Sequence, residues 1–160
     1  MDDTDRALVE ALRADGRATY AELGRIVGLS PPTVHERVRR LEAAGIITGY
    51  HAAVEPVAFG LGVGALVGVL LSDDHEADDV VAALHDMSQI EDCWFVAGDE
   101  TLVLKVRVPD VDALEETLGA LRRTAGVART RTTVVLSTRW EDRIRPTRAT
   151  AAPVRPAARP

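Results

Sequence analysis

Two short segments with helical spacing lie on either side of Gly28, and they constrain the fold of the N-terminal third more than any other feature. The first predicts a helix over 20–27, whose buried face is formed by Leu23, Ile26 and Val27. The second has Ser30 as its N-cap, a proline at its first helical position, and Gly45 as its end. Two short helices joined through a glycine turn are typical of the helix-turn-helix arrangement.

Small and apolar residues fall where such a pair of helices must pack. Gly24 lies where the two helices approach closely, and Gly28 lies in the turn, where a positive φ is often needed. The inward positions of the second helix are Val34, Val38 and Leu41. A preceding helix over 3–15 places further apolar side chains on one stripe, namely Leu8, Ala11 and Leu12. The sequence therefore predicts three packed helices.

The outer face of the last of these helices is polar and basic. A recognition helix points its N-terminal residues at base edges in the major groove, and its arginines reach phosphates or guanine. We expect DNA contacts from Ser30, Pro32, Thr33, His35, Glu36, Arg39 and Arg40. The alternative is a plain helical bundle with solvated arginines. Arg37 precedes the buried Val38 and is able to pair with Glu10 or Glu42 instead.

The formal net charge of −6 does not exclude nucleic acid, because the acidic residues are unevenly distributed. Residues 1–50 carry seven Arg against eight acids, and residues 51–140 carry seven basic residues against fifteen acids. Residues 141–160 carry five Arg against two acids. We expect the acidic middle to repel DNA and to confine contact to the N-terminal unit.

The rest of the chain alternates strand and helix patterns in the order strand, helix, strand, strand, helix, strand. A Val/Leu/Gly run over 61–72 predicts the first strand, and a helix follows over 74–87 with Ala77, Val80, Val81 and Leu84 inward. Two strands over 90–98 and 101–109 form a hairpin around Gly98-Asp99-Glu100. Asp110 caps the second helix, whose core stripe is Val111, Leu114, Leu118 and Leu121. The last strand is expected over 127–140.

This βαββαβ order predicts an α+β, ferredoxin-like sandwich with an antiparallel sheet and helices on one face. We expect a second copy of the protein to cover the other face. The predicted organisation is a winged helix-turn-helix domain over 1–48, a linker strand over 49–60, a βαββαβ domain over 61–142 and a disordered Pro/Ala/Arg tail over 143–160. The glycines of the first strand do not have dinucleotide-fingerprint spacing.

No catalytic or metal-binding constellation is expected. His35-Glu36 is not followed by the second histidine of a zinc helix. The single Cys93 excludes an internal disulfide, and we interpret it as a small core residue. The longest apolar run is shorter than the roughly 20 residues of a membrane-spanning helix, and no leader opens the chain. We therefore expect a cytoplasmic protein without a cofactor, a metal or a membrane partner.

The segment "SPPTVHERVRRLEAAGIITGY", from Ser30 to Tyr50, strongly resembles the N-terminal region of Lrp/AsnC (feast/famine) transcriptional regulators. The later segment "CWFVAGDETLVLKV" resembles the effector-binding and oligomerising domain of the same family, and the resemblance covers roughly residues 2–140. It implies dimers assembled through the sheets, often higher oligomers such as octamers, and a small effector, commonly an amino acid.

The resemblance also implies an effector pocket at the glycine-aspartate loop, here Gly98, Asp99, Glu100 and Thr101. Backbone N–H groups of a glycine turn suit a carboxylate and the two acids suit an ammonium group, so the loop fits a zwitterion. Many members have an aspartate where this chain has Thr101, which bears on the identity of the effector. Thr133 and Ser137 share a face of the last strand and are further candidates. The alternative is a solvated hairpin turn.

We expect a sequence-specific regulator of double-stranded DNA in the bacterial cytoplasm, associated with the nucleoid. A dimer would present two recognition helices to a pseudo-palindromic operator, and the effector would change the arrangement of dimers. Two alternatives remain. Sirohaem decarboxylases resemble this family and are enzymes, for which His51 would be the residue to test. An amino-acid sensor that does not bind DNA is the other.

Overall fold

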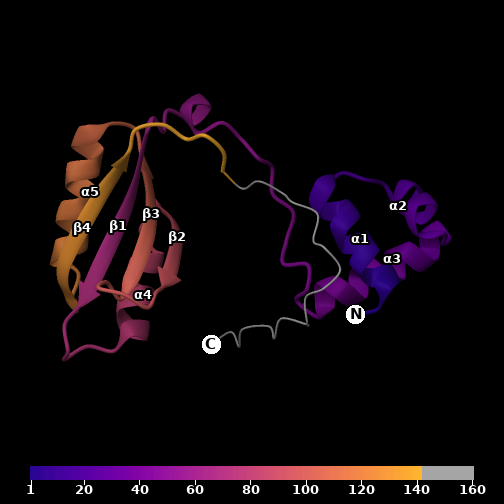
Figure 1. Ribbon diagram of the computed structural model, residues 1–160, viewed down its shortest axis with the longest axis horizontal. Coiled ribbons are helices and arrows are strands. Elements are labelled where there is room, and N and C mark those ends of the chain that lie inside the picture. Colours follow the sequence, from indigo (N-terminus) through magenta and orange to yellow (C-terminus); the bar gives the residue numbers. More distant parts are fainter. Residues whose placement is uncertain (142–160) are drawn as a thin grey trace. The chain divides into compact units, whose positions relative to one another are not determined.

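The computed structural model describes residues 1–141, which divide into one compact unit over 1–53 and another over 54–139 (Figure 1). The tail predicted over 143–160 lies outside the described residues. Within the described part of the chain, no helix has the length and apolar character needed to cross a membrane.

Three helices form the N-terminal unit, as predicted: α1 (Asp3–Ala14), α2 (Tyr20–Val27) and α3 (Pro31–Ala43). Their shared core consists of Leu8, Leu23, Val34 and Val38, all 1% exposed or less. Capping boxes that the sequence analysis did not identify start the first two helices. Asp2 and Asp5 bond each other's backbone N–H at α1, and Thr19 and Glu22 do the same at α2.

The glycine positions between α2 and α3 are confirmed. Gly28 ends α2 with φ 69°, in the left-handed region. A β-carbon on Gly24 would lie 2.5 Å from the Leu29 carbonyl oxygen, so only glycine allows this approach. The prediction that Ile26 is buried is wrong, because its side chain is 62% exposed. The close approach at Gly24 turns the buried face of the short helix toward Leu23 and Gly24, and Ile26 is left on the solvent side.

The connection between the units differs from the prediction. The linker strand expected within 49–60 is absent, and so is a strand-built wing, because residues 46–62 contain no strand. This segment forms instead a 3₁₀ helix over Pro56–Phe59. Pro56 lacks the N–H that a ladder requires and has a fixed φ, so it favours the start of a helical turn over a strand.

The second unit has the predicted order: β1 (Val63–Leu71), α4 (Ala77–His85), β2 (Ile90–Phe95), β3 (Leu102–Val108), α5 (Val111–Arg123) and β4 (Val127–Val135). All strand pairs are antiparallel, and the order in the sheet is β2-β3-β1-β4 (Figure 1). One sheet face and both helices share a core, whose fully buried members include Val67, Val69, Leu84, Leu102, Leu104, Val106 and Leu121. The α+β ferredoxin-like prediction is confirmed.

The opposite sheet face carries no helix of this unit. Strand register places Leu66 and Trp94 on it, 42% and 45% exposed, beside small and charged neighbours. Lys105 lies between them on β3 and forms ion pairs with Glu91 at 3.0 Å and Asp92 at 3.6 Å. This open face is therefore partly apolar and partly occupied by paired charges.

Three side chains of the second unit lie where the sequence did not place them. Val111 is 67% exposed, because it lies in the first turn of α5 beside the exposed cap Asp110. Thr117 of the same helix is buried, although it was not expected in the core. The Thr117 hydroxyl donates to the backbone carbonyl of Ala113 at 2.8 Å. Cys93 is exposed and not a core residue, because β2 is an edge strand of the sheet.

Candidate DNA interface and effector pocket

The exposed face of α3 and its N-cap carries all seven of the residues predicted to contact DNA: Ser30, Pro32, Thr33, His35, Glu36, Arg39 and Arg40. The buried stripe of α3 anchors the opposite face in the three-helix core. Ser30 has the extended backbone of an N-cap but makes no side-chain cap bond. Its hydroxyl shares a hydrogen bond with the Thr33 hydroxyl at 2.8 Å instead.

The first turn of α3 also contacts a residue that the sequence analysis did not single out. The ring of Tyr20, at the start of α2, lies 5.1 Å from the ring of His35, centroid to centroid, at a tilt of 58°. Tyr20 is 41% exposed, so the pair forms part of the surface. Aromatic contacts of this geometry hold a side chain in place, and His35 is therefore partly oriented before any ligand arrives.

The three arginines of α3 divide into two kinds. Arg39 and Arg40 are exposed, and no ion pair holds either of them in the described part of the chain. Arg37 pairs with neither Glu10 nor Glu42, contrary to the alternatives considered from sequence. Its guanidinium contacts Asp2 and Asp5 at the start of α1, at 2.7 Å each, because the capping box places both carboxylates beside it.

The far end of α3 is tied to the chain that leaves this unit. The hydroxyl of Tyr50 donates to Oε1 of Glu42 at 3.0 Å. Burial and the Glu42 carboxylate together raise the pKa of the Tyr50 hydroxyl to about 12. Tyr50 therefore remains a neutral donor over the whole physiological range.

The second unit contains a pocket of about 520 Å³ between β1, β4 and the loop that joins β2 to β3. Two of the predicted effector residues, Asp99 and Glu100, line it, together with Gly68, Leu70, Arg129, Thr130 and Arg131. Asp99 is exposed and free to meet a cation. Register places Leu70 beside Arg129 on the open face of the sheet, so the pocket floor is formed by strand side chains.

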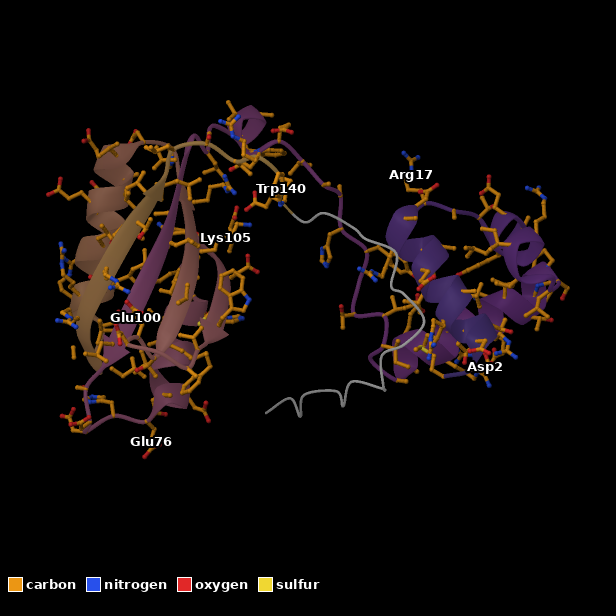
Figure 2. The ribbon with its side chains drawn as sticks, viewed as in Figure 1. Asp2, Arg17, Glu76, Glu100, Lys105 and Trp140 are labelled. Atoms are coloured by element: carbon orange, nitrogen blue, oxygen red, sulfur yellow. The ribbon has the colours of Figure 1, made fainter. Side chains whose placement is uncertain are left out.

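An ion pair between a half-buried acid and an exposed arginine organises one side of this pocket. Glu100 is 19% exposed and forms an ion pair with Arg131 at 2.5 Å (Figure 2 labels Glu100 against the sheet). Gly68 makes this position possible, because a β-carbon there would lie 2.6 Å from Cγ of Glu100. The pair leaves Asp99 and Arg129 as the pocket's unpaired acid and base among the described residues.

The other four predicted effector residues do not line the pocket. Gly98 is exposed in the loop, and Thr101 is half-buried with its backbone N–H donating to the Val69 carbonyl at 2.9 Å. Thr133 pairs with Leu66 on the same sheet face but does not line the pocket. Ser137 follows the end of β4 and lies outside it as well.

Sequence reasoning missed the two pocket arginines. Arg129 and Arg131 alternate with threonines in "ARTRTT", so their period of two places both on one sheet face. This alternation could have been read from the sequence. Only the register of β4 against β1, however, shows that the arginine-bearing face of β4 lies beside the loop between β2 and β3. No group of side chains suited to a metal ion occurs among the residues the structure describes.

Family models match both units. The AsnC-type helix-turn-helix domain matches residues 1–42, and the Lrp/AsnC ligand binding domain matches residues 64–144. The chain is 46% identical over 143 residues to the HTH-type transcriptional regulator LrpA of Mycobacterium tuberculosis, covering 89% of this chain and 95% of that protein. It is 42% identical over 141 residues to the leucine-responsive regulatory protein of Salmonella typhimurium, covering 85% of each.

Solved structures agree with these matches. A feast or famine regulatory protein from M. tuberculosis complexed with L-methionine superposes with a TM-score of 0.85 and 45% sequence identity. The superposition covers 91% of this chain and 99% of that one.

Proposed function

The chain belongs to the Lrp/AsnC family of transcriptional regulators, and from this premise we propose that α3 binds an operator while the pocket beside Asp99 binds an amino acid. The regulator is favoured over the decarboxylase-like enzyme and over the DNA-independent sensor, because the matched relatives are named as an HTH-type transcriptional regulator and a leucine-responsive regulatory protein. Because the proposed target is operator DNA, we expect the protein to act in the cytoplasm, at the nucleoid.

The observation that carries the DNA-binding assignment is the contrast among the arginines of α3. Arg37 is committed to two carboxylates of α1, whereas Arg39 and Arg40 extend from the exposed face with no ion pair in the described residues. Free guanidinium groups on a helix that fits the major groove bind phosphates or guanine. Thr33 and His35, in the first turns of the same face, then lie at base edges.

The open face of the sheet supports self-association. Exposed Leu66 and Trp94 on this face remain in water unless a second copy covers them. A dimer would present two α3 helices to a pseudo-palindromic operator with half-sites about 34 Å apart. Octamers or other higher assemblies would extend the same contacts.

The pocket suits a zwitterion with an aliphatic side chain. Asp99 offers a carboxylate to the ammonium group, while Arg129 offers donors to the carboxylate. Leu70 provides the apolar wall. The M. tuberculosis relative crystallised with L-methionine supports an amino acid of this class. Thr101 then affects which amino acid is preferred.

The DNA assignment is tested by selecting duplexes from a random pool with the intact protein and measuring their affinity. The selected duplex should bind the wild-type chain far more tightly than a scrambled duplex, and Arg39→Ala with Arg40→Ala should abolish that preference without loss of helicity by circular dichroism. Unchanged affinity of the double variant in a gel-shift assay would remove these arginines from the site.

The effector assignment is tested by thermal-shift screening of the twenty amino acids, followed by sizing with and without each hit. Binding to the native state raises the melting temperature. Asp99→Ala should remove the shift and leave basal DNA binding intact. A hit that binds the Asp99→Ala variant with wild-type affinity would refute the pocket assignment.

A further inference from the structure

Arg37 connects the middle of α3 to the first turn of α1. Its Nη1 donates to Oδ2 of Asp2 and to Oδ1 of Asp5, at 2.7 Å in both cases. The side chains of Arg37 and Asp5 are 24% and 12% exposed, whereas that of Asp2 is 54% exposed, so the Arg37–Asp5 bond is the sheltered half of this contact. In Figure 2 Asp2 is labelled at the N-terminal end of the chain, where α1 begins.

The two carboxylates are fixed by α1 itself. The backbone N–H of Asp5 donates to Oδ1 of Asp2 at 2.7 Å, and the backbone N–H of Asp2 donates to Oδ2 of Asp5 at 3.2 Å. Each carboxylate thus uses one oxygen for the capping box and the other for Arg37. The bond from the Asp5 backbone, followed by the bond from Arg37, lowers the pKa of Asp2. Both acids present an ordered, charged acceptor pair to α3.

The other attachments of α3 to this unit are largely apolar. Val34, Val38 and Leu41 form its buried stripe, and burial of apolar surface is non-directional, so it allows small rotations of a helix about its axis. A guanidinium held by two charge-assisted hydrogen bonds has a defined direction. Arg37 flanks the buried stripe and therefore restricts the rotation that decides where Thr33, His35 and Arg40 point.

We propose that Arg37 is a positioning residue for DNA recognition: held by Asp2 and Asp5, it fixes the rotation of α3 and does not contact phosphate itself. This inference rests on the proposed function of α3. It makes a prediction opposite to that of simple electrostatics. Removing acids near a DNA-binding surface should strengthen binding to a polyanion, whereas removing Asp2 and Asp5 should weaken specific binding because α3 loses its orientation.

The experiment measures affinity for a wild-type-selected duplex and for a scrambled duplex of equal length, over a range of salt concentrations. The variants are Arg37→Gln, the double variant Asp2→Asn with Asp5→Asn, and all three changes combined. Asparagine keeps the shape and an oxygen acceptor at each cap, so the double variant decides the matter if Arg37→Gln does not fold. Glu10→Gln removes another acid of α1, and Arg40→Gln removes an exposed arginine of α3, as matched controls.

Arg37→Gln and the double aspartate variant should each lose about tenfold in specific affinity, comparable to one lost base contact. The combined variant should lose no more specific affinity than Arg37→Gln or the double aspartate variant alone, because all of these changes break the same contact. Affinity for the scrambled duplex should not fall, and it should rise in the double aspartate variant, which loses two negative charges. The salt slope should stay unchanged in these variants, whereas Arg40→Gln should reduce it by about one. A role in stability alone would lower the melting temperature without changing the ratio of specific to non-specific affinity.

The inference is overturned if Arg37→Gln reduces the salt slope as Arg40→Gln does, which would make Arg37 a phosphate contact. It is also overturned if the aspartate variant binds the selected duplex as tightly as Glu10→Gln does, or more tightly. Failure of the wild-type chain to prefer any selected duplex would instead refute the proposed function.

Discussion

Gly68 on β1 lies directly beneath Glu100 of the loop between β2 and β3, so closely that a β-carbon at position 68 would come within 2.6 Å of Cγ of Glu100. The absence of a side chain at Gly68 lets Glu100 lie over the strand and reach Arg131. One glycine of the apolar first strand is thus part of the pocket, which its composition alone did not indicate.

Gly68→Ala should weaken amino-acid binding by about tenfold, the equivalent of one lost polar contact. The new methyl group forces Glu100 away from Arg131 and changes the pocket wall. Calorimetric titration with L-methionine, or with the best hit of the thermal-shift screen, measures the change. Gly64→Ala on the same face of β1 is the control, because its β-carbon would meet its nearest neighbour at an ordinary 3.6 Å. Equal affinities for the two variants would contradict this role of Gly68.

Gly24→Ala should destabilise the N-terminal unit by about 1–3 kcal/mol, the usual cost of overpacking a core. Its β-carbon would lie 2.5 Å from a backbone oxygen, that of Leu29, which moves only with the turn itself. Both tyrosines of the chain lie within residues 1–53, so tyrosine fluorescence during urea unfolding reports on this unit.

Gly16→Ala provides the comparison for that measurement, because its β-carbon would have ordinary contacts at 3.7 Å. It should leave the unfolding midpoint close to that of the wild-type chain. If Gly24→Ala were as stable as Gly16→Ala, the close approach of α2 to the following turn would not be a constraint on the sequence.

Tyr50→Phe should change how the N-terminal unit responds to alkaline pH. The folded-state pKa of Tyr50 is about 12, above its ordinary value of 10. A raised folded-state pKa means that the stability from the Tyr50–Glu42 bond is fully present below pH 10 and is lost as pH rises through 12. The gap in melting temperature between wild type and variant should therefore narrow across this interval. A constant gap from neutral pH to pH 12 would contradict the coupling.

Much of the fold was predictable because short-range patterns determine it. The approximate bounds of α2, 20–27, were predictable because Gly28 ends the helix, and the structure gives Tyr20–Val27. In the sequence Leu102, Leu104, Val106 and Val108 alternate with Val103, Lys105 and Arg107, and the first four form the buried face of β3. The order of elements then restricted the sheet to one familiar topology.

The errors arose where tertiary contacts decide between equal local preferences. Nothing near Arg37 in the sequence favours Asp2 and Asp5 over Glu10 or Glu42, because the choice depends on how α1 crosses α3. The pocket arginines required the register of β4 against β1 for the same reason. The linker strand predicted over 49–60 had suitable residues but forms no ladder in the described chain.

The central claim is that DNA binding and amino-acid binding reside in separate units of one chain. The most direct test measures both affinities, for the selected duplex and for L-methionine or the best hit, in three proteins: wild type, Arg39→Ala with Arg40→Ala, and Asp99→Ala. We predict that the arginine variant loses the duplex and keeps the amino acid, while Asp99→Ala loses the amino acid and keeps the duplex. The account would be contradicted if either variant, while folded, lost affinity for both the duplex and the amino acid, or kept affinity for both.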